Sequence, residues 1–246
     1  MSSRPSRRSE AADAPAAPRR RLDAETRRRL MIERAAEHFA RHGFDSPTRK
    51  LAADMGVTQA LIYKHFGSKA GLIDRTLETV LGGGRERRFD PQAPLEQALT
   101  TFYRALVGGM TETRVRLFVR AGLDGRAWPT RRGDALTRTL FLPVIAGLRA
   151  AAGLAPLEDR PPMRGERELV MMLHAAMVFF GIRRFVYNMP MPENLDDVVA
   201  LQVRTFVAGA VAQIAHLHRD EAEASLTLRL AVAEITPPDP EGTSSR

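Results

Sequence analysis

The 246-residue sequence contains no cysteine, which excludes disulfide bonds and thiolate metal sites and is consistent with a reducing compartment. It also lacks a long hydrophobic run. The longest, residues 169–182, spans 14 residues and includes His174, whereas a membrane-spanning helix needs about 20. The N-terminus lacks the apolar stretch of a secretory signal. We therefore expect a cytoplasmic protein that does not enter a membrane.

The common signatures of catalysis are absent as well. The sequence has no Walker-type phosphate loop, no Gly-x-Ser-x-Gly and no His-Glu-x-x-His, and the glycines at 82–84 are not followed by lysine. His38 and His42 have the four-residue spacing of metal ligands, but no carboxylate or third histidine accompanies them in the motif. We expect two solvated helix positions there. The prediction is therefore no enzyme, no catalytic residue, no cofactor and no metal.

Positive charge is concentrated at one end of the chain. Residues 1–70 hold 15 Lys and Arg against 8 Asp and Glu, a net charge of +7 out of +8 for the whole sequence. Residues 1–21 are rich in Ser, Ala, Pro and Arg without periodicity, and both they and the polar tail 236–246 are expected to be disordered. A basic end on a near-neutral body is typical of a polyanion binder, although a solubilising tail would explain part of it.

Within this basic third, residues 48–69 have the pattern of a helix-turn-helix. Leu51 and Met55 are apolar at helical spacing, and Gly56 follows where the chain must reverse, a position that favours positive φ. Thr58 is placed to cap a second helix, which Ile62 and Phe66 would bury on one side. Its outer side is polar and basic, as a helix entering a DNA major groove requires.

The same stretch resembles the DNA-binding domain of the tetracycline-repressor (TetR) family, over residues 24–80. The matching residues are Val57, Thr58, Ile62, Tyr63, Lys64, His65, Phe66, Ser68, Lys69 and Leu72, preceded by Met31, Ala35, Phe39, Gly43 and Phe44. One departure is Pro47, which stands where the family often has Thr or Ser, in a link that is one residue shorter than usual. The resemblance implies a three-helix DNA-binding head on a larger helical body.

To read bases in a DNA major groove, the protein needs side chains on the N-terminal half of the second helix of the motif. The predicted base contacts are Gln59, Ala60 and Leu61, with Arg49 added by the resemblance. The predicted phosphate contacts are Thr48, Thr58, Tyr63, Lys64, His65 and Lys69. For Tyr63 and His65 the alternative is packing on the helix surface, and for Lys64 it is a solvated charge. The chain's only lysines are Lys50, Lys64 and Lys69, all in this motif.

The remaining sequence predicts more helices and no sheet, so the expected fold is all-α. The domains are a disordered tail at 1–21, a helix-turn-helix domain at 22–81, a helical ligand-binding and dimerisation domain at 85–235, and a tail at 236–246. A helix over 134–152 should kink at Pro143. Residues 166–187 are apolar nearly all round and are expected to be buried on most sides. Helix 195–217 is amphipathic, and the strand-like alternation at 225–232 is interpreted as a weak helix.

The body is predicted to hold a small-molecule ligand among its aromatic and methionine side chains, each of which has ordinary core packing as its alternative. The candidates are Phe102, Phe118, Trp128, Phe141, Met172, His174, Met177 and Phe180. By resemblance, the chain is expected to repress transcription as a homodimer on a near-palindromic double-stranded DNA operator and to be released by an inducer. Helices 166–187 and 195–217, including Phe206, would form the dimer interface, and the glycines at 82–84 a hinge. The alternative function is a helical small-molecule-binding or catalytic protein with a vestigial head.

Overall fold

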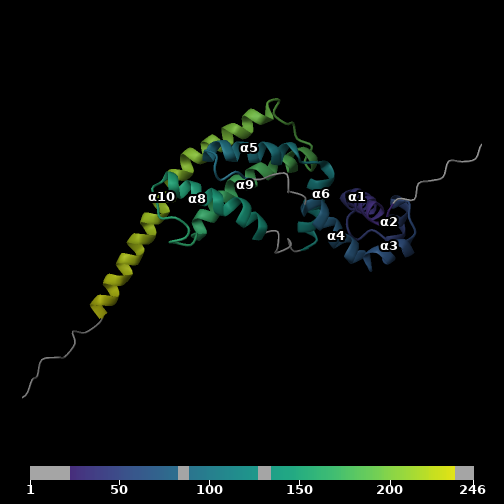
Figure 1. The fold of residues 1–246 in the computed structure, drawn as a ribbon, viewed down its shortest axis with the longest axis horizontal. Helices are drawn as coiled ribbons and strands as arrows, with labels where there is room; N and C mark the ends of the chain where they lie inside the picture. The colour runs from purple at the N-terminus through teal and green to yellow at the C-terminus, as the bar shows by residue number, and fades with distance from the viewer. Residues whose placement is uncertain (1–22, 83–88, 127–133, 236–246) are drawn as a thin grey trace, which may run out of the picture.

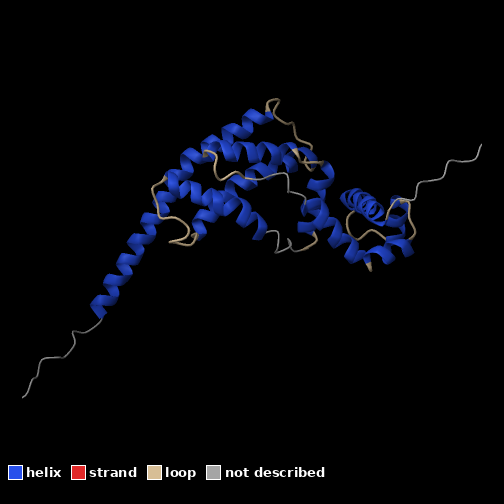
Figure 2. Ribbon diagram, in the orientation of Figure 1, coloured by secondary structure: helices blue, strands red, loops and turns tan. Residues whose placement is uncertain are grey.

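The computed structural model describes residues 23–82, 89–126 and 134–235, and side chains as far as residue 224. The described part is helical and contains no strand, which confirms the all-α prediction (Figures 1 and 2). The head consists of α1 (Ala24–His42), α2 (Thr48–Met55), α3 (Gln59–Phe66) and α4 (Lys69–Gly82). The body consists of α5 (Leu95–Gly108), α6 (Glu112–Leu123), η1 (Thr137–Phe141), α8 (Leu142–Ala151), α9 (Arg164–Phe185) and α10 (Leu195–Ile235).

Several features named above lie outside the described residues. They are the N-terminal basic segment 1–21, the C-terminal tail 236–246, residues Gly83 and Gly84 of the glycine run, and Trp128. Gly82 is the last residue of α4. The proposed glycine hinge and the predicted domain limits therefore stay predictions.

The local signals for the head helices are confirmed. The Asp23 carboxylate caps α1 by accepting a hydrogen bond of 2.8 Å from the Thr26 amide. Gly56 takes the left-handed conformation, with φ of 67°, and ends α2. The Thr58 hydroxyl accepts from the Leu61 amide at 3.2 Å and so begins α3. Together these contacts set the tight reversal between α2 and α3.

Two hydrophobic cores hold the described residues together, and α6 contributes to the head. The head core is built mainly from α1, α2 and α4, with Phe39, Leu51 and Leu72 almost fully buried. Leu117 and Ala121 of α6 also belong to it. On its other side α6 packs closely on α9, where a Cβ at Gly181 would lie 2.8 Å from Val115 Cγ2. Helix α6 is thus the mechanical link between head and body (Figure 1).

The helix predicted over 134–152 contains a π-helical turn directly before Pro143. Residues Thr137–Phe141 are π-helical and lead directly into α8, in which Pro143 is the second residue. Proline lacks an amide hydrogen, and its ring clashes with the carbonyl four residues earlier. Widening the preceding turn relieves that clash while the chain continues as a helix.

Helix α10 is longer than the sequence suggested. It runs without interruption from Leu195 to Ile235, so the strand-like alternation at 225–232 is part of the same helix. No glycine or proline follows Gly209 in this helix to break it. Its far end projects away from the body on the side opposite the head (Figure 1). By length and composition alone, its segment Leu195–Ala224 could also cross a membrane, which the search for uninterrupted apolar runs missed.

The prediction that α9 is buried on most sides is wrong for the single chain. Val170, Leu173 and Met177 are buried in the body core, whereas Met172 is 61% exposed and Phe179 is 47% exposed. A sequence that is apolar all round shows that most of its faces are suited to burial. It does not show whether the same chain supplies the partner for each face.

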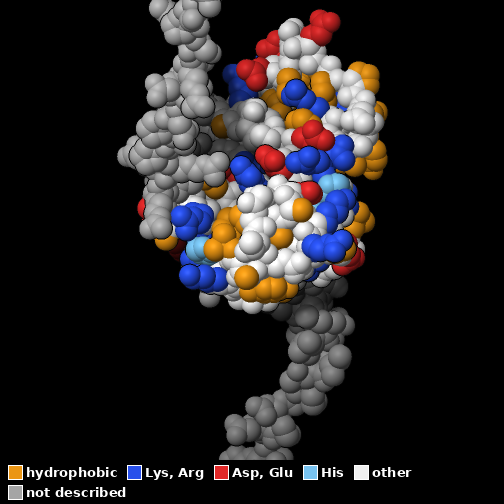
Figure 3. All heavy atoms as spheres, turned by 90° about the vertical axis from the view of Figure 1, so that its right-hand side faces the viewer, with side chains coloured by type: hydrophobic (Ala, Val, Ile, Leu, Met, Phe, Trp, Pro, Cys, Tyr) orange, Lys and Arg blue, Asp and Glu red, His pale blue; other side chains and the backbone are white. Residues whose placement is uncertain are grey.

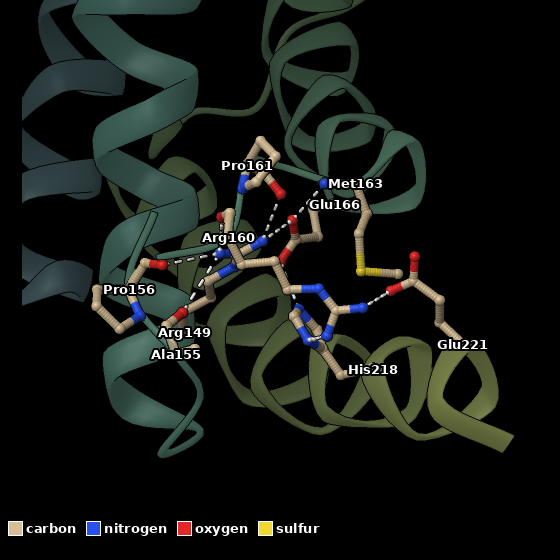
Figure 4. Close-up of polar contacts among 9 residues, drawn as sticks. All are labelled: Arg149, Ala155, Pro156, Arg160, Pro161, Met163, Glu166, His218 and Glu221. Atoms are coloured by element: carbon tan, nitrogen blue, oxygen red, sulfur yellow. Dashed lines mark hydrogen bonds and ion pairs between the residues drawn. The ribbon is translucent and has the colours of Figure 1, made fainter. Parts of the chain in front are cut away.

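A buried ion pair joins the ends of α8 and α9 to α10 (Figure 4). The Arg149 guanidinium donates to both oxygens of the Glu166 carboxylate, at 2.6 and 2.7 Å. Arg149 also donates to the carbonyls of Arg160 and Pro161, in the loop before α9. Both side chains are almost fully buried. Such a pair is favourable only when its remaining hydrogen-bonding groups are satisfied, as they are here.

Further contacts complete this cluster. Glu166 accepts from the Met163 amide at 2.7 Å, and His218 Nε2 of α10 lies 2.9 Å from Glu166 Oε1. Nearer the surface, Arg160 pairs with Glu221. Residues from two helices and the intervening loop therefore meet α10 at one point, which fixes where α10 leaves the body.

Candidate nucleic-acid interface

Helix α3 is held on the head by its apolar side and presents the other side outward. Ile62 is fully buried, while Ala60, Tyr63 and Lys64 are exposed and Gln59 is half-buried. Leu61 is half-buried and packs against the head core, so only part of its side chain faces outward. Viewed from the head end, Lys and Arg side chains lie on both sides of an outer surface of uncharged and apolar atoms (Figure 3). A largely uncharged centre with basic side chains beside it suits base reading between two lines of phosphates.

The predicted phosphate contacts other than Thr48 lie on α3, at its N-cap, or at the start of α4. Thr58 is exposed, and because its hydroxyl oxygen accepts from Leu61, its hydroxyl hydrogen remains able to donate. His65 and Lys69 are half-exposed at the far end of α3 and the start of α4.

The other predicted contacts lie at the start of α2. Thr48 is the first residue of this helix and Arg49 is exposed beside it. Pro47 occupies the cap position and makes no side-chain hydrogen bond to the first turn. The departure from the family pattern thus leaves amide hydrogens at this helix end without a side-chain acceptor, and a phosphate oxygen is a suitable partner for them.

Three arginines that the sequence analysis did not identify support this interface. Arg28 donates to the His65 carbonyl at 2.8 Å, Arg34 to the Met55 carbonyl at 2.9 Å, and Arg120 to the Ala40 carbonyl at 3.0 Å. Each carbonyl lies in the last turn of a head helix, namely α3, α2 and α1. Cationic side chains satisfy such carbonyls and complement the negative end of the helix dipole. These arginines therefore act within the fold, and only their abundance was visible in the sequence.

The prediction that His38 and His42 are solvated is wrong for His38, which is 1% exposed. His38 Nδ1 lies 2.6 Å from Asp54 Oδ2 on α2, and its Nε2 lies 2.5 Å from Ser46 Oγ. Burial lowers the pKa of His38 and outweighs the opposing effect of Asp54. The same hydrogen bond lowers the pKa of Asp54. A carboxylate does accompany the two histidines, but it comes from the next helix.

The predicted ligand residues of the body fall into separate groups. Phe102, Phe141, Met177 and Phe180 share one buried core. The His174 ring lies 5.9 Å from that of Phe141 and 6.1 Å from that of Tyr103, measured between ring centroids. In contrast, Met172 is on the outer surface and Phe118 is half-buried on α6. The structure therefore brings five of the eight candidates together, counting His174.

Two polar atoms in this core lack a partner among the described residues. They are the Tyr103 hydroxyl and His174 Nδ1. Burial raises the pKa of Tyr103 and lowers that of His174 to about 4, so both groups are neutral near pH 7. Unpaired buried polar groups are costly, and a bound molecule is one way to satisfy them. Tyr103 was not among the sequence candidates, and nothing in its local pattern distinguishes it from other core residues.

An open apolar groove runs along the outside of the body between α9 and α10. Its lining includes Leu169, Met172, Ala176, Leu201, Thr205, Phe206 and Gln213. Leu201 is 54% exposed at its edge, whereas Phe206 is only 7% exposed and packs in the body core. The groove is therefore formed by core residues at its floor and by exposed apolar residues at its rim.

Comparison with known proteins identifies the head. Residues 31–76 match the family model described as "Bacterial regulatory proteins, tetR family". A stretch of 40 residues is 52% identical to the HTH-type transcriptional regulatory protein RaaS of Mycobacterium tuberculosis. That alignment covers 16% of this chain and only 19% of RaaS, so it concerns a small part of each protein.

Solved structures extend the similarity of fold to most of the chain. A TetR family transcriptional regulator from Pseudomonas syringae is 22% identical, covers 76% of this chain and 97% of its own, and has a TM-score of 0.54. A tetR-family regulator from Streptomyces coelicolor is 16% identical, covers 89% and 94%, and has a TM-score of 0.56. At these identities the likeness shows the fold. The family match over residues 31–76 shows that the head is that of the tetR family of bacterial regulatory proteins.

Proposed function

We propose that the protein is a cytoplasmic transcriptional regulator that binds double-stranded DNA as a homodimer, represses at a near-palindromic operator and is released by a small-molecule inducer. The observation that carries the proposal is the outward polar face of α3, anchored by buried Ile62 on one side and by Arg28 at its end. Gln59 would read a base edge, and the surrounding hydroxyl and basic groups would hold phosphates. The proposal assigns no reaction to the body.

The DNA contacts predict two different mutant phenotypes. Gln59→Ala is expected to weaken binding to the preferred duplex by about 1–3 kcal/mol, because a bidentate contact to a base is lost. Lys69→Ala is expected to weaken binding to all duplexes alike. It should also lower the slope of the logarithm of the binding constant against the logarithm of salt concentration by roughly one unit. The measurement is fluorescence anisotropy over a range of salt concentrations, with a duplex selected from random sequence and a scrambled duplex.

Arg219→Ala is the matched control, because Arg219 is an exposed cation on α10, far from α3. This variant should bind as the wild type does. Wild-type affinity of both Gln59→Ala and Lys69→Ala for the selected duplex would contradict the assignment of α3. A wild type with no salt-dependent DNA binding would favour the alternative of a vestigial head.

The proposed ligand site is the core around Tyr103 and His174, whose hydroxyl and Nδ1 have no partner in the described residues. A neutral, largely aromatic or apolar molecule with a hydrogen-bonding group fits this environment, since both side chains are neutral and rings surround them. Helix α9, which carries His174, contacts α6, and α6 packs into the head core. A ligand that displaces α9 can therefore move the head through α6.

The His174→Phe variant tests whether His174 contacts the ligand without destabilising the fold. The substitution removes an unpaired buried nitrogen and keeps a ring of similar size, so Tm is expected to stay equal or rise. A compound that releases the wild type from its selected duplex is expected to lose at least about tenfold in potency on this variant, since the loss of one hydrogen bond to a buried ligand costs about 1.4 kcal/mol. Release measured by anisotropy at wild-type potency would show that His174 is an ordinary core residue.

A further inference from the structure

We propose that the head binds a divalent transition-metal ion of the Zn²⁺ type at His38, His42 and Asp54. One ligand atom from each residue lies within 4.8 Å of the other two. His38 Nδ1 is 2.6 Å from Asp54 Oδ2, and His42 Nε2 is 3.7 Å from the same oxygen. The residues come from two helices, because α1 supplies both histidines and α2 supplies the aspartate.

The spacing requires only small adjustments to surround an ion. Ligands at about 2.0–2.1 Å from a tetrahedral Zn²⁺ lie about 3.3 Å from one another. The two distances to Asp54 bracket that value, so each changes by less than about 1 Å. His38 is fixed by burial, whereas the side chains of His42 and Asp54 are 35% and 42% exposed and are free to close on the ion.

Ser46 supplies the supporting contact that such sites normally have. A histidine that binds metal through one ring nitrogen usually donates the hydrogen on the other nitrogen to an oxygen, which fixes its orientation. His38 Nε2 lies 2.5 Å from Ser46 Oγ, so Nδ1 is the nitrogen that faces Asp54. The ring is therefore oriented for coordination before an ion arrives.

The ligand set selects the class of metal. Two imidazoles and one carboxylate suit Zn²⁺, Co²⁺, Ni²⁺ or Cu²⁺, whereas Mg²⁺ and Ca²⁺ prefer oxygen ligands alone. With three protein ligands, a fourth position remains for water, which the exposure of His42 and Asp54 allows. Lys50 Nζ lies 3.4 Å from His42 Nδ1 and would have to turn into solvent. The site is therefore expected to bind less tightly than a closed four-ligand site.

Metal binding here would link α2 of the helix-turn-helix to α1. Asp54 lies in the last turn of α2, two residues before the left-handed Gly56, and the histidines lie in the last two turns of α1. An ion held by both helices would stabilise this corner of the head. This consequence does not depend on the ligand or the oligomeric state proposed above.

The test uses the full chain after removal of any histidine tag. Titration with Co²⁺ is expected to give one equivalent per chain with the intense visible absorbance of a tetrahedral or five-coordinate site, and excess Zn²⁺ is expected to raise Tm. His42→Ala and Asp54→Asn should each weaken Co²⁺ binding by at least tenfold. Ser46→Ala, which keeps all three ligands, should weaken it roughly tenfold to hundredfold.

The matched control is His216→Ala, because His216 Nδ1 lies 3.5 Å from Asp220 Oδ1 in an exposed pair on α10. It should bind Co²⁺ as the wild type does. Since His42 and Asp54 are exposed, both ligand variants are expected to keep wild-type circular dichroism without metal. The proposal is overturned if Co²⁺ keeps its aqueous spectrum, or if His42→Ala and Asp54→Asn both retain wild-type affinity. It is equally overturned if His216→Ala alone abolishes binding.

Discussion

Replacing Glu166 with glutamine is expected to lower the free energy of unfolding by about 3–5 kcal/mol, because it leaves the buried Arg149 guanidinium without its counter-charge. Both side chains are almost fully buried, and Arg149 donates to both carboxylate oxygens. The carbonyls around Arg149 would remain but carry no full charge to offset it. The measurement is the urea midpoint by circular dichroism, at constant protein concentration because a dimer's stability depends on it.

Glu221→Gln is the control, since it breaks the partly exposed pair with Arg160 in the same cluster. Exposed pairs contribute about 0–1 kcal/mol, so its midpoint should stay near that of the wild type. If the two variants had equal midpoints, the buried pair would contribute no more than a surface pair. Replacing both Arg149 and Glu166 with apolar residues is a separate case, because no unpaired buried charge remains.

The same carboxylate predicts how stability changes in acid. Burial alone would raise the pKa of Glu166, but hydrogen bonds from Arg149, His218 and the Met163 amide outweigh burial and lower it. A carboxyl whose pKa is lower in the folded than in the unfolded state stabilises the fold above its unfolded pKa. That stabilisation is lost as pH falls through the folded-state value. The difference in stability between wild type and Glu166→Gln should therefore shrink in acid, and an acid-independent difference would contradict the assignment.

Replacing Leu201 with glutamate is expected to raise the dissociation constant of the proposed homodimer by more than about a hundredfold, which corresponds to roughly 3 kcal/mol or more. Leu201 is 54% exposed at the rim of the groove between α9 and α10, near Met172 at 61%. A two-fold interface through this groove would bury two of the new charges without partners. Sedimentation velocity over a range of protein concentrations measures the effect.

Leu123→Glu provides the comparison, because Leu123 is 81% exposed at the end of α6 and lies outside the groove. It should sediment as the wild type does. A monomeric wild type, or a Leu201→Glu variant that remains dimeric, would place any dimer interface elsewhere. If only Leu123→Glu caused the dimer to dissociate, the dimer interface would instead include α6.

Phe206, on the face predicted to form this interface, is unsuitable for such a test. It is 7% exposed and packs in the body's own core. A glutamate there would leave a buried unpaired charge in each chain and would unfold the body before it reported on assembly. Helical periodicity identified Phe206 as apolar and inward-facing, but it does not distinguish an intramolecular core from an interface between copies.

The features predictable from sequence are those set by residues close together in the chain. Gly56 and Thr58 each act within three or four residues, through a left-handed turn or a cap, and both were predicted correctly. The fold class followed from helical periodicity over long segments. The outer face of α3 followed from the same periodicity, whereas its role in binding DNA stays a prediction.

The features that sequence reasoning missed depend on residues far apart in the chain. His38 meets Asp54 across 16 positions, and Arg120 meets the Ala40 carbonyl across 80. No spacing rule connects such residues, because the contact exists only after α1, α2 and α6 have packed. In an arginine-rich chain, an arginine that caps a helix also looks like any other basic residue.

The packing of α6 has a consequence for how this protein can be divided. Leu117 and Ala121 fill part of the head core, and Arg120 satisfies carbonyls at the end of α1, yet all three lie more than thirty residues beyond α4. A fragment ending at Gly82 would expose that apolar surface and leave those carbonyls to water. An excised head would therefore aggregate or require a redesigned surface. A chimera that joins this head to another regulator's body would have to carry α6 with it.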